Sequence, residues 1–202
     1  ELSDSTIRVF GLGATPQQSD GATRAMRELG FTDDELVSAG ISVRREGRVY
    51  DMFRQRAIFP IIDAQGRVLG FGGRALGDVK PKYLNTGDTP IFNKRQGVFA
   101  ANLLKKQRGL KRVILTEGYM DVISLHQAGF TNAVASLGTA LTSGHASLVK
   151  RYTQEVLLLY DSDEAGVKAA LRAIPILREA GVNSRVVNLR PHKDPDEFIK
   201  AE

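Results

Sequence analysis

The sequence has no cysteine, only three histidines and no long apolar segment. Without cysteine the chain cannot form disulfides, a cysteine nucleophile or a cysteine-based zinc site, and it fits a reducing compartment. His126, His145 and His192 do not have the spacing of metal ligands, so a bound metal would be held by oxygen. No window reaches the roughly 18 apolar residues of a membrane span, and the first residues do not form a signal peptide. We therefore expect a cytoplasmic protein with neither zinc nor a membrane partner.

Charge is distributed unevenly along the chain. Residues 41–112, here called the basic block, contain 16 Lys and Arg against 5 Asp and Glu, a net charge of +11. The other residues carry 12 against 18, a net charge of −6. An excess this one-sided indicates a polyanionic partner such as nucleic acid or nucleotide. A solvated surface is the structural alternative, and membrane-surface binding is disfavoured because the basic residues do not follow an amphipathic helix.

The first half of the chain combines short helices with a small sheet. Residues 20–40 predict two helices with Asp20 and Thr32 as N-caps. Apolar and polar residues then alternate over residues 43–93 between turn signals such as Glu46-Gly47, which indicates a mostly antiparallel sheet.

The second half changes to strands that alternate with helices. Strand patterns near residues 112–118, 132–139, 155–163 and 184–189 are separated by helical patterns, which predicts a mainly parallel sheet flanked by helices. The fold class is therefore α/β and α+β. We place the boundary near Gly109, with a basic N-terminal subdomain over residues 1–109 and a second domain over residues 110–202.

Acidic residues follow three of the predicted parallel strands. Glu117 ends the first strand, and "LLLYDSDEAG" places Asp161 and Asp163 at the end of the third. "HKDPDEF" places Asp194 and Asp196 just past the fourth. Because ligands bind beyond the carboxyl ends of such strands, we expect these carboxylates to converge. Clustered carboxylates repel one another unless cations neutralise them, and hard oxygen ligands suit Mg²⁺ or Mn²⁺.

Each acid also has a purely structural interpretation. Asp163 suits the N-cap of the following helix, and Asp194 and Asp196 could cap a helix that begins at Pro195. Glu117 could be an exposed loop residue, and Asp121 could lie on an ordinary helix surface. These interpretations do not explain why all the acids should lie at one end of one sheet.

The quoted segments resemble a known family. "TEGYMDVISL", "YDSDEAG" and "KDPDEF" resemble the toprim domain, a metal-binding fold of bacterial primases, topoisomerases and some nucleases. Upstream, "FRQRAIFPIIDAQGRVLGFGGRAL", "PKYLNTGDTPIFNKRQGVF" and "AVASLGTALT" are similar to the RNA polymerase core of bacterial DnaG-type primases. The similarity covers nearly the whole chain, and the order of the segments makes it specific.

The resemblance implies synthesis of RNA primers from ribonucleoside triphosphates on a single-stranded DNA template. It makes Glu117, Asp161 and Asp163 the catalytic residues and main ligands of a two-metal site. Asp121, Asp194 and Asp196 would complete or assist the site. The nucleic-acid and nucleotide contacts that the resemblance implies are Arg56, Arg74, Lys82, Asn85 and Lys94.

Two features of the basic block have alternative explanations. Phe71, Tyr83 and Phe92 could stack on bases, but for each of them a role in the core is favoured. "GFGGRA" at residues 70–75 fits a weak dinucleotide-binding pattern, yet no helix follows it, so we predict a tight glycine turn there.

The resemblance also bears on partners. A whole primase adds a zinc module before this region and helical, helicase-binding parts after it, so we expect a catalytic-core fragment that meets a replicative helicase only through regions absent from it. A monomer is the default expectation. The rival hypotheses are a toprim nuclease or topoisomerase cleavage domain, and a non-catalytic nucleic-acid-binding module. None of the five tyrosines stands in a recognised nucleophile context.

Overall fold

The computed structural model describes residues 1–201, which form two compact units. The antiparallel unit consists of residues 7–61 and 68–93, and the parallel unit consists of residues 1–6, 62–67 and the chain from Lys94 onward. The predicted single boundary near Gly109 stays a prediction. No helix among the described residues is long and apolar enough to cross a membrane.

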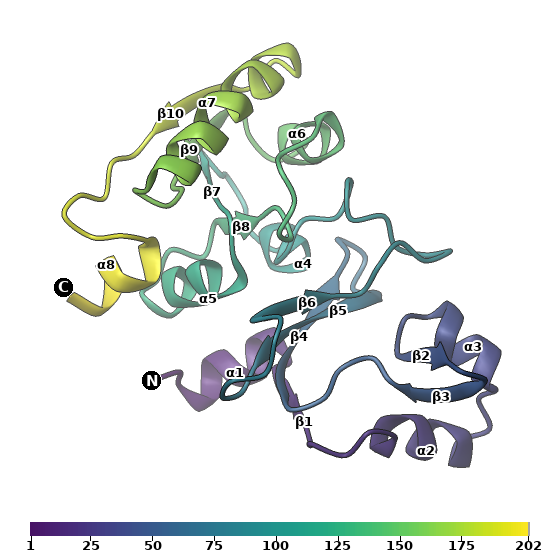
Figure 1. Ribbon diagram of the computed structural model, residues 1–202. Coiled ribbons are helices and arrows are strands. Elements are labelled where there is room, and N and C mark those ends of the chain that lie inside the picture. The colour runs from purple at the N-terminus through teal and green to yellow at the C-terminus, as the bar shows by residue number, and fades with distance from the viewer. Residues whose placement is uncertain (202) are drawn as a thin grey trace. The chain divides into compact units, whose positions relative to one another are not determined.

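The antiparallel unit holds a four-stranded sheet, a two-stranded hairpin and two short helices (Figure 1). The sheet order is β1-β4-β5-β6, and β1 pairs with β4, and β5 with β6, in antiparallel fashion. The elements of this part of the chain are α1 (Asp4–Phe10), β1 (Gly13–Thr15), α2 (Gly21–Glu28), α3 (Asp33–Ser38), β2 (Ser42–Arg45), β3 (Arg48–Asp51), β4 (Arg56–Ile62), β5 (Val68–Ala75) and β6 (Tyr83–Asn85).

Local sequence signals account for much of this unit. Thr32 forms a capping box with Glu35 at the start of α3, as its N-cap position predicts. The β2–β3 hairpin turns at Glu46 and Gly47, whose φ angles of 48° and 76° match a turn that needs two left-handed residues.

The predicted glycine turn at residues 70–75 is wrong, because these residues lie inside β5. Packing explains the glycines instead. A Cβ at Gly73 would lie 2.7 Å from the Phe53 ring and 2.9 Å from Cδ of Arg56, so only glycine lets the strand approach these side chains.

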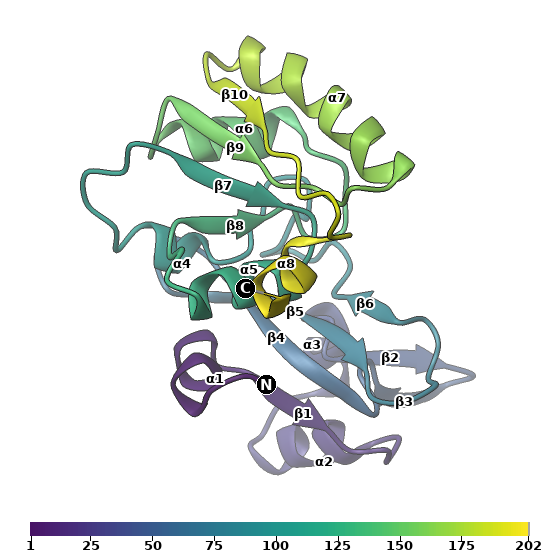
Figure 2. The same cartoon turned by 90° about the vertical axis from the view of Figure 1, so that its left-hand side faces the viewer.

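The parallel unit confirms the predicted parallel sheet with flanking helices. Its strand order is β10-β9-β7-β8 with every pair parallel, and Figure 2 shows the strands in that order. The elements are α4 (Ala101–Leu104), β7 (Val113–Thr116), α5 (Tyr119–Gln127), β8 (Ala133–Ala135), α6 (Ser143–Lys150), β9 (Glu155–Leu158), α7 (Glu164–Glu179), β10 (Asn183–Val186) and α8 (Pro195–Ala201).

The core of the parallel unit lies around its central strands. All four residues of β7 and all three of β8 are buried, as expected for strands covered on both faces. Val156 and Leu158 of β9 are also buried, whereas β10 at the edge of the sheet is mostly exposed. This rigid centre fixes the loops that leave the carboxyl ends of β7, β9 and β10.

Candidate active site

The strand order brings the predicted acids to one edge of the parallel sheet. β7 and β9 are neighbours, and β10 lies beside β9. Glu117 follows β7, Asp161 and Asp163 follow β9, and the loop after β10 leads to α8. α8 packs on α5, and the two helices lie side by side in both views (Figures 1 and 2). Segments about 80 residues apart in the sequence therefore meet at this edge.

Glu117 is partly buried at the end of β7. Its Oε1 is inaccessible to solvent and has no hydrogen-bond partner among the described residues. Burial raises the pKa of this carboxyl, and the negative charges of Asp161 and Asp163 raise it further, against a hydrogen bond from the Asp161 backbone. A buried carboxylate oxygen without a partner is stabilised when it binds a cation or accepts a hydrogen bond.

Asp121 lies in the first turn of α5, where it accepts a hydrogen bond of 3.1 Å from the Gly118 backbone N–H. Burial, followed by the charges of Asp161 and Asp194, raises the pKa of Asp121 to about 7. Asp121 is thus partly buried and lies in the field of acids from two other loops, which an ordinary exposed helix position would not be.

Asp161 connects the other acids electrostatically. Burial raises its pKa first, and the charges of Asp194 and Asp163 add to the effect, while Lys193 opposes it. The backbone of Asp161 lies against the first turn of α7. A Cβ at Gly166 would come within 2.8 Å of the Asp161 carbonyl carbon and closer still to its oxygen, so the glycine of "YDSDEAG" is needed for this approach.

Asp163 and Asp194 act as helix caps, as the structural alternative predicts. Oδ1 of Asp163 accepts a 2.9 Å hydrogen bond from the Gly166 N–H at the start of α7. Oδ1 of Asp194 accepts a 2.8 Å hydrogen bond from the Glu197 N–H in α8. Capping uses one oxygen of each carboxylate, and each charge still contributes to the raised pKa of Asp161.

Asp196 has two side-chain partners. The Ser124 hydroxyl of α5 donates a short hydrogen bond to its Oδ1, and Lys200 Nζ lies 2.5 Å from its Oδ2. The contact with Ser124 joins α8 to α5, whereas the ion pair with Lys200 lies within α8. The sequence contains no separate signal for Ser124, because the contact joins residues 72 positions apart.

Sequence reasoning also did not select Tyr160 for this edge. The pairing of Leu115 with Leu158 places Glu117 and Tyr160 at equivalent positions on neighbouring strands. The Tyr160 hydroxyl is buried, and burial, then the charge of Glu117, raises its pKa against an opposing hydrogen bond with the Ser136 side chain. Tyr160 therefore carries a neutral hydroxyl beside Glu117, which strand register could have revealed.

The acids fit a divalent cation by their chemistry. Among residues 1–201 no three His, Asp or Glu side chains stand close enough to hold a metal ion without rearrangement. However, burial and then the charge of Asp161 raise the pKa of both Glu117 and Asp121, and Glu117 has a buried oxygen without a partner among the described residues. Oxygen ligands with uncompensated negative charge suit Mg²⁺ or Mn²⁺. His126 and His145 instead contact the backbone carbonyls of Ala133 and Lys94.

The predicted nucleic-acid contacts fall in both units. Arg56 of β4 is 3% exposed, and its Nη1 donates to the carbonyls of Gly73 and Lys82 at 3.4 and 3.5 Å. The β5–β6 register places Arg74 and Asn85 on one face of the sheet, opposite the face on which Gly73 meets Arg56.

Lys82 and Lys94 differ in their surroundings. Lys82 is exposed, and its Nζ lies 5.9 Å from the centre of the Tyr83 ring. Lys94 belongs to the parallel unit, where its carbonyl faces His145. Of the aromatics, Phe92 is buried in a core, Phe71 packs edge-on against Phe53, and Tyr83 is exposed.

Two family models match the chain. Residues 1–105 match the model described as "DNA primase catalytic core, N-terminal domain", and residues 114–199 match the "Toprim-like" model. The chain is 47% identical to a DNA primase of Clostridium acetobutylicum over 98% of its own length and 33% of the relative. It is 46% identical to a DNA primase of Deinococcus radiodurans over 99% of its length and 36% of the relative. It thus spans about a third of the curated relatives' length.

Solved structures are similar over the whole chain. A crystal structure of a DNA primase domain from Pseudomonas aeruginosa matches with a TM-score of 0.91 at 40% identity, covering 100% of this chain and 64% of the other. A structure described as the DnaG primase catalytic domain bound to ssDNA matches with a TM-score of 0.90 at 38% identity and the same coverage.

Proposed function

Because this chain belongs to the bacterial DnaG-type DNA primase family, we propose that it takes part in primer synthesis, the joining of ribonucleotides on a single-stranded DNA template. The observation that carries this proposal is the convergence of acids at the carboxyl ends of parallel strands, where burial and then the charge of Asp161 raise the pKa of both Glu117 and Asp121. Such an arrangement suits metal-dependent nucleotidyl transfer.

The proposed metal ligands are the acids of this edge. Glu117, Asp161 and Asp163 would hold Mg²⁺ or Mn²⁺ as the main ligands. Asp121, Asp194 and Asp196 would complete or assist this site through the neighbouring loops. When bound, divalent ions supply activation of the primer 3′-hydroxyl and neutralise charge on the leaving pyrophosphate. The carboxylates would position the bound ions. The close approach of the Asp161 backbone to Gly166 limits how far the loop after β9 can move.

The template and the triphosphates would contact the basic block. A relative is described as bound to ssDNA, which supports a single-stranded partner for this chain as well. Lys82 offers an exposed ammonium beside the Tyr83 ring, and Arg74 shares a sheet face with Asn85. Arginine and lysine bind phosphates through charge-assisted hydrogen bonds, and this binding weakens as salt concentration rises. The proposed contact residues are Arg56, Arg74, Lys82, Asn85 and Lys94.

Ribonucleotide incorporation tests the proposal. The chain would be incubated with single-stranded DNA, labelled ribonucleoside triphosphates and Mg²⁺ or Mn²⁺, beside a reaction that follows cleavage of labelled DNA. We expect template-dependent RNA products that disappear in Glu117→Gln. Glu164→Gln is the matched control, because Glu164 is exposed at the start of α7 and pairs with Lys168.

The same reactions separate the rival functions. Metal-dependent DNA cleavage without incorporation would favour a nuclease or topoisomerase domain. DNA binding with neither reaction, in both the wild-type chain and Glu164→Gln, would favour a non-catalytic binding module.

A further inference from the structure

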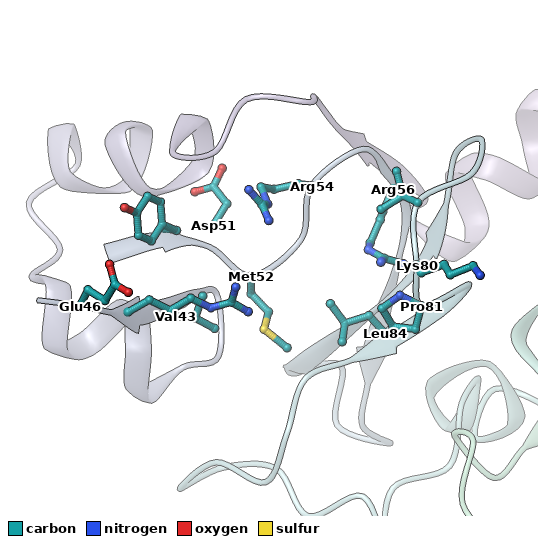
Figure 3. A pocket seen from close by; sticks show the side chains of 12 residues that line it. Val43, Glu46, Asp51, Met52, Arg54, Arg56, Lys80, Pro81 and Leu84 are labelled. Atoms are coloured by element: carbon teal, nitrogen blue, oxygen red, sulfur yellow. The ribbon is translucent and has the colours of Figure 1, made fainter. Parts of the chain in front are cut away.

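Three side chains at the start of α6 lie outside both of the sites described so far. The cavity of about 450 Å³ in the antiparallel unit, with Arg54 and Arg56 among its lining residues, belongs to the template contact already proposed for Arg56 (Figure 3). The acids of the parallel unit belong to the proposed active site. Thr142, Gly144 and His145, here called the α6 clamp, form the N-cap and first turn of α6 and are part of neither.

The α6 clamp contacts a turn that belongs to the basic block. Residues 94–97, here called the basic turn, lie outside every helix and strand. Lys94 is one of the proposed phosphate contacts, and Arg95 beside it is exposed. Downstream, Phe99 is fixed by a bridge to Ala135 of β8. A turn has no ladder of backbone hydrogen bonds, so its conformation depends on the contacts that other elements supply.

All three members of the α6 clamp reach the backbone of the basic turn. Nε2 of His145 lies 3.0 Å from the Lys94 carbonyl oxygen, and the Thr142 hydroxyl donates a short hydrogen bond to the Arg95 carbonyl. A Cβ at Gly144 would lie 2.8 Å from the same Arg95 oxygen, so glycine allows the approach. Because peptide units are planar, two successive fixed carbonyls also set the direction in which the Lys94 side chain leaves the turn.

Both ring nitrogens of His145 have defined roles. Nδ1 accepts a 3.2 Å hydrogen bond from the Thr142 backbone N–H, as part of the capping box at the start of α6. Since an accepting nitrogen carries no hydrogen, the hydrogen of the neutral ring is on Nε2, which donates it to the Lys94 carbonyl. The side chain is fully buried, and burial lowers the pKa of the imidazole, which favours the neutral ring.

A helix cap alone does not require a histidine at this position. In the Thr32 capping box, a glutamate accepts the equivalent backbone N–H. His145 adds a second nitrogen that carries a donor, and this donor is used on the basic turn. His126 has the same chemistry in the same unit, but its Nε2 contacts the carbonyl of Ala133 at 2.9 Å instead. The contact of His145 with the basic turn is therefore separate from its role as a cap.

We propose that His145 is a positioning residue for nucleotidyl transfer: with Thr142 and Gly144 it holds the basic turn so that the Lys94 ammonium meets the phosphates of a triphosphate or of the template. The proposal rests on the proposed function, which gives Lys94 a phosphate contact. His145 is itself buried and does not touch these ligands. Loss of its Nε2 donor would keep the charge of Lys94 but release its direction, and would therefore weaken phosphate binding.

Two amide substitutions separate positioning from capping. In His145→Gln the side-chain amide nitrogen can take the place of Nε2 and donate to the Lys94 carbonyl. In His145→Asn the side-chain oxygen can take the place of Nδ1 and accept from the Thr142 N–H, but the side chain is too short to reach Lys94. Glutamine therefore keeps the proposed positioning contact, and asparagine keeps only the cap. His126→Asn is the matched control, because it removes a histidine–carbonyl contact of the same kind elsewhere in the unit.

Hydrogen exchange measured by mass spectrometry reports on the basic turn without any reaction. We expect residues 94–98 to exchange about fivefold faster in His145→Asn than in the wild type, as loss of one hydrogen bond implies. Exchange in His145→Gln and His126→Asn should stay within about twofold of the wild type there. Thr142→Val removes the bond to the Arg95 carbonyl at nearly constant volume, so it should raise exchange at the same residues, and it serves in place of His145→Asn if that variant does not fold.

Incorporation kinetics show whether the held turn acts through Lys94. His145→Asn should raise the KM for ribonucleoside triphosphates or for the template about fivefold, with kcat changed less than about twofold, whereas His145→Gln should stay near the wild type. The substrate whose KM rises identifies the phosphate that Lys94 meets. In a double-mutant cycle, His145→Asn should have no further effect once Lys94 is replaced by alanine.

Equal exchange at residues 94–98 in the wild type, His145→Asn and Thr142→Val would overturn the proposal. So would the same loss from His145→Asn with and without the Lys94 side chain, because His145 would then not act through Lys94. An unchanged KM in Lys94→Ala would remove the positioning role together with the Lys94 contact, while the acidic site would still be tested by Glu117→Gln. Affinities for ATP and for a labelled oligothymidylate give the same cycle without catalysis, so a failure of incorporation alone would count against the proposed function only.

Discussion

The two units gather like charges by different routes. In the parallel unit, acids from the loops after β7, β9 and β10 meet because the sheet places these strands side by side. In the antiparallel unit, the guanidinium of Arg56 is buried against the carbonyls of Gly73 and Lys82, and the basic block supplies further cations. Lys200 pairs with Asp196 and Lys193 partly offsets the charges around Asp161, whereas Arg56 contacts two backbone carbonyls rather than a carboxylate. A charged group that serves the fold has its hydrogen-bond partners within the fold. Asp51, for example, accepts three hydrogen bonds from residues of α2.

This difference is informative about function. A folded protein is more stable when each buried charge has an opposite charge beside it. A buried charge without such a partner lowers the stability, and it is retained where a ligand supplies the opposite charge. The acidic edge then suits a cation, and the buried guanidinium of Arg56 suits an anion. The following predictions test this contrast, from the largest expected effect to the smallest.

Asp161→Asn should reduce ribonucleotide incorporation by at least about a hundredfold, since one metal ligand and one charge are lost. Without metal the variant should be as stable as the wild type or more so, because repulsion from Asp194 and Asp163 is relieved. Thermal unfolding with and without Mn²⁺, alongside incorporation, measures both effects. Wild-type incorporation with an unchanged Mn²⁺-induced shift would refute the site.

Asp163→Asn sharpens the same test, because Asp163 caps α7. Asn caps about as well as Asp, so helix stability should hardly change. If Asp163 is also a ligand, incorporation and Mn²⁺ stabilisation should both fall. If the variant keeps wild-type incorporation and wild-type stabilisation by Mn²⁺, Asp163 has the capping role alone.

The metal-free stability of the chain should fall as pH rises from about 4 to about 7. The pKa of Asp121 is about 7 in the folded state and near its ordinary value when unfolded, so the folded chain binds the extra proton in this window. The expected slope is up to about 1.4 kcal/mol per pH unit. Denaturant unfolding in EDTA at several pH values measures it, and Asp121→Asn should flatten it. An equal slope in that variant would exclude Asp121 as the source.

Gly166→Ala should destabilise the chain by about 1–3 kcal/mol, although alanine normally favours a helix. The added Cβ would collide with the Asp161 backbone and displace the loop that carries Asp161 and Asp163. Gly21→Ala is the matched control, because Gly21 begins α2 and its Cβ would make only ordinary contacts of 3.4 Å or more. Thermal unfolding and Mn²⁺ titration would show whether only Gly166→Ala lowers stability and metal affinity.

Lys82→Ala should weaken binding to single-stranded DNA of any sequence and lower the salt dependence by about one unit of log–log slope. The reason is the loss of one exposed ammonium beside Tyr83. Anisotropy titrations at several salt concentrations measure the slope. An unchanged slope would remove Lys82 from the proposed contacts.

The sequence by itself determined the alternation of strands and helices, the parallel sheet and the positions of the acids along the chain. These features follow from local periodicity and capping, as the Thr32 capping box and the buried strand β7 illustrate. Knowledge that ligands gather beyond the carboxyl ends of parallel strands was enough to group Glu117, Asp161 and Asp163.

Only the tertiary structure decided which side chains are buried together. The glycines at residues 70–75 looked like a turn, but Gly73 lies in β5 because Phe53 and Arg56 pack against it. Ser124 reaches Asp196, and Arg56 reaches the carbonyl of Lys82, through contacts that depend on packing between distant segments. Burial and the field of neighbouring charges depend on distances in three dimensions, which local sequence patterns do not encode.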